Sequence, residues 1–154
     1  MISIRRTGYD DGDFLQLVDM LNIEFVEMYG SSKEKFAGEN KLDEHTKVII
    51  LYDVEKPVAC GALKPMTIEG TGELKRMFVL RAYRRQGLSK VILSALEGWA
   101  WELGYETIRL KTGKKQVAAI HLYENAGYNF IEPYGGYKNI PDSVCMEKTQ
   151  AKSD

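Results

Sequence analysis

The stretch from Gly72 to Gly104 reads GELKRMFVLRAYRRQGLSKVILSALEGWAWELG, and it decides the fold that the sequence predicts. Its first part is typical of a strand over residues 73–80, with apolar β-forming bulk from Met77, Phe78 and Val79. A basic turn, RRQGLS at residues 84–89, follows. The last part predicts a long amphipathic helix that ends at Gly104, because a glycine just past a helix readily takes a positive φ. The apolar face of this helix is predicted to contain Leu88, Val91, Ile92, Ala95, Leu96, Trp99 and Leu103.

A strand that enters a helix through a short basic turn makes a site for an anion. The backbone N–H groups of the first helical turn have no partners within the helix and lie at the positive end of its dipole. Gly87 has no side chain, so the oxygen atoms of an anion can approach the backbone there. Arg84 and Arg85 would add charge, although a solvated basic turn explains these arginines equally well. The N–H groups expected at the anion belong to Gln86, Gly87, Leu88, Ser89 and Lys90.

The bulk composition limits the class of protein. The 154 residues suit a single domain, which we place at residues 1–150 before a polar tail at 151–154. The net charge of −1 argues against a nucleic-acid partner. No apolar run reaches the roughly 18 residues of a membrane span, and the N-terminus lacks a signal-peptide core, so we expect a cytoplasmic protein with no membrane partner. Cys60 and Cys145 lie in apolar runs and are expected to be buried thiols.

Hydrophobic periodicity predicts the other elements of a mixed α/β sheet with helices on both faces. Further helices are expected around residues 14–28, with an apolar face from Phe14 to Met28, and around 115–126. Residues 31–44 fit either a short helix around 33–37 or a loop. The step from residue 73 to 111 should be a right-handed parallel crossover between strands. Strands are expected at residues 2–5, 47–53, 57–63, 73–80, 107–111, 128–131 and 143–148, with a turn at 112–113 and a loop at 132–142.

Two motifs resemble those of the GCN5-related N-acetyltransferase (GNAT) superfamily. The turn at residues 84–89 is similar to the family's cofactor motif Arg/Gln-x-x-Gly-x-Gly/Ala, except that Ser89 stands at the final position. The run QVAAIHLYENAGY at residues 116–128 is similar to Asn-x-x-Ala-x-x-x-Tyr-x-x-x-Gly-Phe. Gln116 replaces the asparagine and Tyr128 the phenylalanine, while the matching residues are Ala119, Tyr123 and Gly127.

This resemblance implies an acyl-CoA N-acyltransferase fold, whose mostly antiparallel central sheet contains one splayed parallel pair. It implies acetyl-CoA as the acyl donor and direct attack by a primary amine of a small molecule, amino acid or peptide within a ternary complex. The alternative is a non-catalytic acyl-CoA-binding or sensor domain of the same fold. The resemblance also implies a homodimer, with contacts through the strands after Gly127. No metal is implied, and the two histidines, His45 and His121, stand apart in the sequence.

The resemblance also implies roles for individual residues. The strand edge at residues 77–79 would pair with the pantetheine arm and polarise the thioester, and Gln116 would reach the cofactor. Tyr123 would donate a proton to the leaving thiolate, the alternative being a tyrosine that only packs the core. Glu73 would take a proton from the acceptor ammonium, directly or through water, or else is an exposed glutamate at the end of its strand.

Residues for the acceptor amine are expected in loops that cover this stretch. Tyrosines there would form the walls of a pocket, and glutamates would hold the ammonium charge, although a hydrated surface suits these glutamates equally well. The short loops favour a small acceptor or an exposed lysine over a large folded partner. The candidates are Glu24, Glu27, Tyr29 and Phe36 near the first helix, and Tyr134 and Tyr137 in the late loop.

Overall fold

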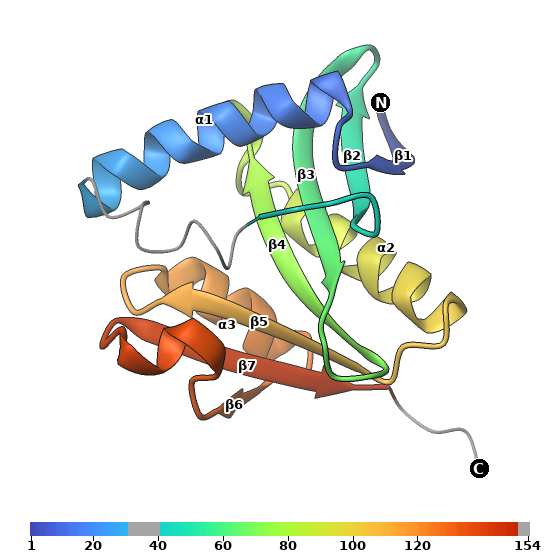
Figure 1. Cartoon of the computed structure of the whole chain (residues 1–154). Helices are drawn as coiled ribbons and strands as arrows, with labels where there is room; N and C mark the ends of the chain where they lie inside the picture. The colour runs from blue at the N-terminus through green and yellow to red at the C-terminus, as the bar shows by residue number, and fades with distance from the viewer. Residues whose placement is uncertain (31–40, 151–154) are drawn as a thin grey trace.

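The computed structural model describes residues 1–30 and 41–150. In these two ranges, seven strands form one sheet in the order β1-β2-β3-β4-β5-β7-β6 (Figure 1). The regular elements are β1 (Ile2–Gly8), α1 (Gly12–Tyr29), β2 (Lys47–Asp53), β3 (Lys56–Pro65), β4 (Thr71–Val79), α2 (Leu88–Glu102), β5 (Thr107–Gly113), α3 (Val117–Asn125), β6 (Asn129–Ile131) and β7 (Ser143–Thr149), with 3-10 helices at Arg81–Tyr83 and Gly135–Asn139.

The predicted mixed α/β sheet is confirmed. β1 to β4 pair in antiparallel order, and β5, β7 and β6 form a second antiparallel group. β4 and β5 are the one parallel pair in the described sheet, and they join the two groups. α1 crosses one face of the sheet and α2 covers the opposite face (Figure 1).

Most predicted elements are present, and the differences lie at their ends. The predicted turn at 112–113 is the end of β5, because Thr112 and Gly113 pair with Val144 and Ser143 of β7. The predicted loop at 132–142 contains the 3-10 helix Gly135–Asn139. The proposed short helix around 33–37, together with Phe36, lies outside the described residues.

α1 begins where Asp11 caps it. The Asp11 carboxylate accepts hydrogen bonds from the backbone N–H groups of Asp13 and Phe14, at 2.9 and 3.2 Å, and so satisfies two donors of the first turn. Phe14 and Leu17 are buried against the sheet. The predicted apolar face is wrong at its end, because Met28 is 49% exposed where α1 extends past the strands.

The predicted apolar face of α2 is wrong, because the buried face is rotated from it by part of a turn. Val91 and Leu103 are exposed, whereas Leu93, Glu97 and Ala100 are buried. Residues 91–96 are apolar except for Ser94, so their spacing is compatible with two neighbouring faces of the helix. Glu97 made the face that is buried in the structure look polar in the sequence. Burial of the Glu97 carboxylate is tolerated because Nζ of Lys148, in β7, lies 3.2 Å from it.

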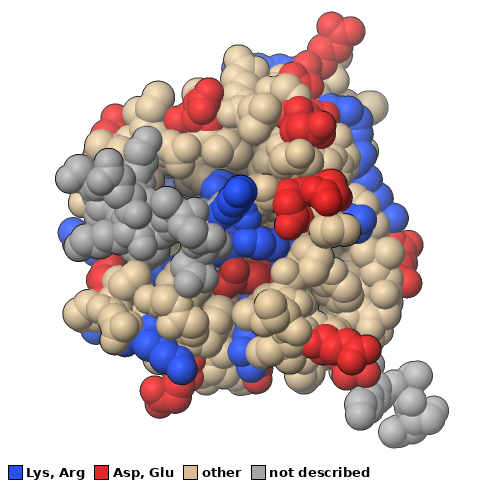
Figure 2. All heavy atoms as spheres, viewed as in Figure 1, with Lys and Arg blue, Asp and Glu red and all other residues tan. Residues whose placement is uncertain are grey.

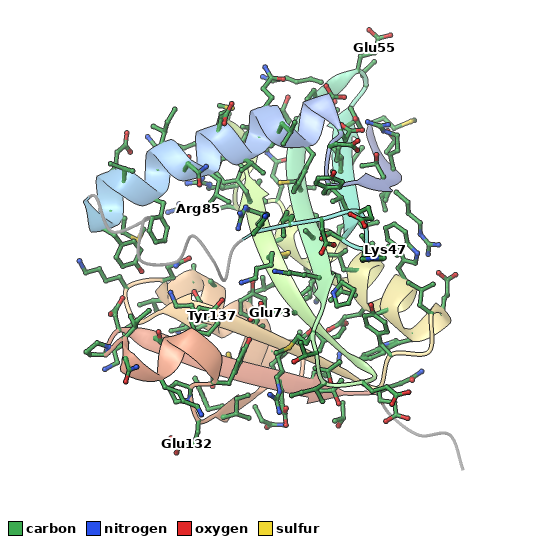
Figure 3. All side chains as sticks on the ribbon, in the orientation of Figure 1. Lys47, Glu55, Glu73, Arg85, Glu132 and Tyr137 are labelled. Atoms are coloured by element: carbon green, nitrogen blue, oxygen red, sulfur yellow. The ribbon has the colours of Figure 1, made fainter. Side chains whose placement is uncertain are left out.

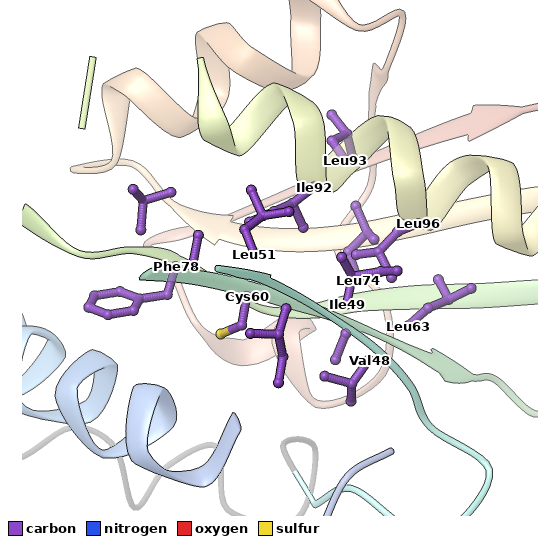
Figure 4. Close-up of a cluster of buried hydrophobic side chains, with 14 of the residues drawn as sticks. Val48, Ile49, Leu51, Cys60, Leu63, Leu74, Phe78, Ile92, Leu93 and Leu96 are labelled. Atoms are coloured by element: carbon purple, nitrogen blue, oxygen red, sulfur yellow. The ribbon is translucent and has the colours of Figure 1, made fainter. Parts of the chain in front are cut away.

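The hydrophobic core fills both faces of the central strands (Figure 4). Ile92, Leu93 and Leu96 pack from α2 onto one face, while Phe78 and Cys60 point towards the side on which α1 lies. The prediction of buried thiols is confirmed, since Cys60 and Cys145 are both free and buried. In the described ranges, no helix combines the length and the apolar composition that crossing a membrane would require.

Gly61 of β3 lets α2 approach the sheet closely. A Cβ atom at this position would lie 2.6 Å from Ile92 Cγ2, 2.6 Å from Met77 Sδ and 2.9 Å from Leu96 Cδ1. Contacts this short in a packed core force neighbouring side chains out of their rotamers. The glycine therefore sets the separation between α2 and the strands that carry the site.

We predict that Gly61→Ala lowers the free energy of unfolding by about 1–3 kcal/mol, because it overpacks this contact. The measurement is urea denaturation followed by circular dichroism. Gly98→Ala is the matched control, since nothing lies within 4 Å of its added Cβ on the exposed side of α2. This control should stabilise the helix by about 0.5–1 kcal/mol. Equal stability of the two variants would contradict the close packing inferred at Gly61.

Candidate active site

The two strands of the parallel pair separate soon after they meet. β4 and β5 pair only through Thr71–Glu73 and Thr107–Arg109. Beyond Glu73, the side of β4 that faces β5 has no partner strand in the described chain, although β3 still pairs with Phe78 and Val79 on the other side. The predicted cofactor residues 77–79 therefore lie on an open strand edge, with Phe78 and Val79 buried and Met77 half-buried.

Between the paired and open parts, β4 has an irregularity at Arg76. The β3–β4 register shifts between Cys60 and Ala62, and Arg76 has a φ of 56°. A bulge of this kind adds a residue to one strand and bends it. This bulge lies where β4 and β5 diverge, so it coincides with the separation of the two strands.

The basic turn leads into a helix start without a side-chain cap. Gly87 is the N-cap of α2 with a φ of 79°. A Cβ atom added to this residue would have nothing within 4 Å. No side chain of the described residues caps the first-turn N–H groups, which a helix leaves without partners of its own. Arg85, with a φ of 66°, is exposed and makes no ion pair with another described residue. The residues that the sequence assigned to the anion are thus assembled around this helix start.

Arg84 is exposed, but neighbouring groups hold its guanidinium. Its Nε donates to the backbone oxygen of Val79 at 2.9 Å, and its Nη2 lies 2.7 Å from Glu24 Oε1. Arg81 lies 3.8 Å from Glu27 Oε2. Glu24, a candidate for the acceptor, therefore contacts the basic turn, and the other candidate, Glu27, contacts the 3-10 helix that precedes it, so both attach α1 to this region.

The second motif lies on α3 and at its start. Tyr123 is buried, and its ring meets the ring of Tyr128 edge-on with 5.7 Å between centroids. Burial raises the pKa of Tyr123 above its ordinary value. Gln116 is the N-cap of α3, and its Nε2 lies 3.5 Å from the hydroxyl of Tyr29. Tyr29 and Gln116, predicted for acceptor and cofactor, are therefore neighbours at the end of α1.

Glu73 lies at the base of the splay in a buried polar cluster (Figure 3). Its Oε1 is 2.9 Å from Lys75 Nζ, and its Oε2 accepts a hydrogen bond from the hydroxyl of Tyr134 at 2.5 Å. Lys75 Nζ also donates to the hydroxyl of Tyr137 at 2.6 Å. The interpretation of Glu73 as an exposed strand-end residue is wrong, because the side chain is only 7% exposed.

This cluster brings together three predicted residues and one that the sequence analysis missed. Tyr134 and Tyr137 meet edge-on at 5.4 Å and cover Glu73 from the late loop. Lys75 was missed, although alternate residues of a strand share a face and Glu73 and Lys75 are two apart. Burial lowers the pKa of Lys75, an effect that the neighbouring Glu73 carboxylate opposes. The charged pair is thus enclosed but mutually stabilised.

The arrangement has the parts that thioester chemistry needs. An open strand edge can pair with an amide-containing chain, and a helix start can bind a phosphate. A buried phenol lies on α3, and a buried carboxylate lies at the base of β4. In the described residues, no group of three or more His, Cys, Asp or Glu side chains is placed to hold a metal ion.

Comparisons with known proteins agree with this geometry. YsnE of Bacillus subtilis, an uncharacterized N-acetyltransferase, is 33% identical over 99 residues, which are 63% of this chain and 65% of that protein. The match therefore spans less than two thirds of the length of that relative. A solved structure of a candidate acyl-CoA N-acyltransferase from Klebsiella pneumoniae is 31% identical, covers 97% of both chains and has a TM-score of 0.80.

The fold also matches more distant structures. The PaiA N-acetyltransferase of Thermoplasma acidophilum, solved in complex with coenzyme A, has a TM-score of 0.69 at 16% identity, covering 97% of this chain and 99% of that one. The family model described as "Acetyltransferase (GNAT) family" matches residues 14–128, which include the basic turn, the open edge of β4 and both motifs. The chain therefore belongs to the GNAT acetyltransferase family.

Proposed function

We propose that this protein transfers the acetyl group of acetyl-CoA to a primary amine of a small molecule, amino acid or peptide. The amine attacks directly within a ternary complex. The observation that carries this proposal is the open edge of β4, which leads through the basic turn to an uncapped helix start. Membership of the acetyltransferase family and the coenzyme A complex of a protein with the same fold support acetyl-CoA as the donor.

The donor would lie along the end of β4 and the start of α2. Backbone N–H groups of residues 86–90 would bind the pyrophosphate, and the exposed guanidinium of Arg85 would add charge. The pantetheine amides would pair with the open edge at residues 77–79, where one N–H would polarise the thioester carbonyl. Arg84 would act indirectly, because its bond to Val79 fixes the turn relative to this edge. Gln116 would contact the cofactor from the start of α3.

Tyr123 would supply the proton to the leaving group. Attack by the amine nitrogen forms the C–N bond, and the C–S bond then breaks to release the thiolate of coenzyme A. Burial keeps the phenol protonated at neutral pH, and the same enclosed surroundings destabilise a thiolate beside it. Tyr123 would transfer its proton to the sulfur. The nitrogen, which carries an extra proton after its attack, would lose that proton to solvent as Tyr123 regains one, so the step balances.

Glu73 would accept the proton that the amine loses. A primary ammonium has a pKa of ~10, so it must be deprotonated before its nitrogen can attack. Both Glu73 oxygens already contact Lys75 or Tyr134, so the proton would reach the carboxylate through a water molecule. Tyr29, Tyr134 and Tyr137 would form the walls of the acceptor pocket. Glu24 would act through Arg84 of the basic turn, and Glu27 through Arg81 just before it.

The cytoplasmic location and the homodimer stay predictions. Phe130 of β6 is 57% exposed at the outer edge of the sheet, among the strands after Gly127. An apolar side chain there would suit a contact between two copies.

We predict release of free thiol from acetyl-CoA when the protein is given members of a panel of primary amines. Gly87→Glu should raise the KM for acetyl-CoA at least about tenfold, because it places a negative charge and a strained side chain at the anion site. The matched control is Gly98→Glu, which adds the same side chain at a later, exposed position of α2.

Two results would count against this prediction. Binding of acetyl-CoA without thiol release on any amine would favour the sensor alternative. An unchanged KM in Gly87→Glu would place the pyrophosphate away from the start of α2.

We predict that Tyr123→Phe lowers kcat by about 10²-fold or more and leaves the KM for acetyl-CoA nearly unchanged, because only the proton donor is removed. Steady-state kinetics with the best amine of the panel provide the measurement. Tyr128→Phe is the control, since it removes a hydroxyl from the ring that packs against Tyr123. If Tyr123→Phe and Tyr128→Phe had the same kcat as each other, Tyr123 would only pack the core.

We predict that Glu73→Gln slows acetylation most strongly at neutral pH. The ratio of wild-type to variant rate should fall as the pH rises towards the acceptor pKa of ~10, because the amine then needs no base. The measurement is a pH profile of kcat/KM for both proteins. A ratio that stays constant across the pH range would show that Glu73 only positions Lys75 and Tyr134.

A further inference from the structure

Four side chains at the base of the opening between β4 and β5 form a closed circuit of contacts. Glu73 Oε1 lies 2.9 Å from Lys75 Nζ, which donates to the hydroxyl of Tyr137 at 2.6 Å. The ring of Tyr137 meets that of Tyr134 edge-on, with 5.4 Å between centroids. The Tyr134 hydroxyl closes the circuit, because it donates to Glu73 Oε2 at 2.5 Å. These four residues, the Glu73 cluster, therefore link the late loop to β4.

Tyr134 is itself held from the neighbouring strand. The guanidinium of Arg109 lies 5.4 Å from the centroid of the Tyr134 ring, and Arg109 is paired with Glu147 of β7 at 3.1 Å. Burial, and after it the Glu73 carboxylate, raises the pKa of Tyr134 above its ordinary value. The phenol therefore keeps its proton and is the donor in the hydrogen bond to Glu73.

Lys75 holds the other oxygen of Glu73 and is equally enclosed. The side chains of Lys75 and Glu73 are 6% and 7% exposed. Lys75 and Tyr137 have further interactions in the chain, so the Glu73 cluster belongs to a larger framework. Figure 2 shows acidic and basic side chains next to each other in the centre of this face, rather than charge of a single sign. The cluster therefore gives Glu73 a fixed position rather than an excess of positive charge.

A fixed position matters for a carboxylate that has to accept a proton. The carboxylate of a glutamate lies at the end of several rotatable bonds, so its oxygens move unless neighbouring groups hold them. A carboxylate has about four sites that accept hydrogen bonds. Lys75 and Tyr134 each occupy a site on a different oxygen, which leaves other sites for the water molecule that would carry the proton. Because proton transfer requires hydrogen-bond distance, a small displacement of Glu73 would lower the rate.

We infer that Tyr134 is a positioning residue of the reaction, whose hydrogen bond holds the Glu73 carboxylate where the proton of the acceptor arrives. Lys75 holds the second oxygen in the same way. This inference rests on the proposed N-acetyltransferase function and deepens it, because it gives a role in the rate to two residues that act through Glu73. Tyr134 then has this role in addition to its place in the wall of the acceptor pocket.

The experiment is a double-mutant cycle of Tyr134→Phe and Glu73→Gln in the full chain, with the best amine of the panel as acceptor. Tyr134→Phe keeps the aromatic ring and removes only the hydroxyl. We expect kcat to fall about tenfold and the KM for acetyl-CoA to stay unchanged, because a hydrogen bond to a charged group is lost. In the Glu73→Gln background, where the base is already absent, Tyr134→Phe should lower kcat no further.

The choice of Tyr134 keeps the fold intact. Lys75→Met would leave the buried Glu73 carboxylate without its cation and so destabilise the protein. Thermal unfolding followed by circular dichroism checks that Tyr134→Phe is folded at the assay temperature. Tyr52→Phe is the matched control, because it removes a tyrosine hydroxyl of β2 that donates to Asp13 of α1 at 2.7 Å. This control should keep the wild-type kcat.

The cycle separates a role through Glu73 from a general effect on the pocket. An unchanged kcat in Tyr134→Phe would overturn the inference. An equal loss of kcat in both backgrounds would also overturn it, because Tyr134 would then act independently of Glu73. Either result leaves the N-acetyltransferase proposal intact. If the wild-type protein acetylated no amine of the panel, both would be overturned.

Discussion

The early end of pairing between β4 and β5 is the constraint on which the rest of the structure depends. A parallel pair normally continues along both strands, but here it stops after Glu73 and Arg109. At the start of this opening lie Glu73 and Lys75 of β4, with Tyr134 and Tyr137 of the late loop bound to them. The irregular residue Arg76 bends β4 at the same point. One strand therefore contributes a paired base, a polar cluster and an open edge within nine residues.

Such an opening costs stability, and polar contacts around it offset the cost. Buried charges are destabilising unless they are paired and hydrogen-bonded. The cluster around Glu73 meets this requirement with Lys75 on one oxygen and Tyr134 on the other. At the other end of the edge, Arg84 connects the backbone of Val79 with Glu24 of α1. On the side of β4 that faces β5, the open edge is thus held at its ends by side chains and not by a paired strand, while β3 pairs with the other side.

Local patterns allowed much of this fold to be predicted, and distant contacts explain what was missed. The strand at 47–53 was predicted with its observed bounds, because an apolar run and the turn residues after it are properties of neighbouring positions. The face of α2 was not, since its choice depends on Lys148, which lies 51 residues beyond its partner Glu97. The motifs located Gly87 and Tyr123, but the surroundings of Glu73 depend on Tyr134, 61 residues away. Sequence spacing contains no information on such a contact unless its partner is already known.

The position of Glu73 beside Lys75 has a consequence for the acceptor. A carboxylate and an ammonium 2.9 Å apart present both signs of charge in one enclosed place, with further cations on the neighbouring strand. An ammonium acceptor would be attracted to the Glu73 carboxylate and repelled by the Lys75 ammonium beside it. In the proposed function, the base would therefore lie in a costly buried ion pair at the point where the strands part, close to the edge that would hold the thioester.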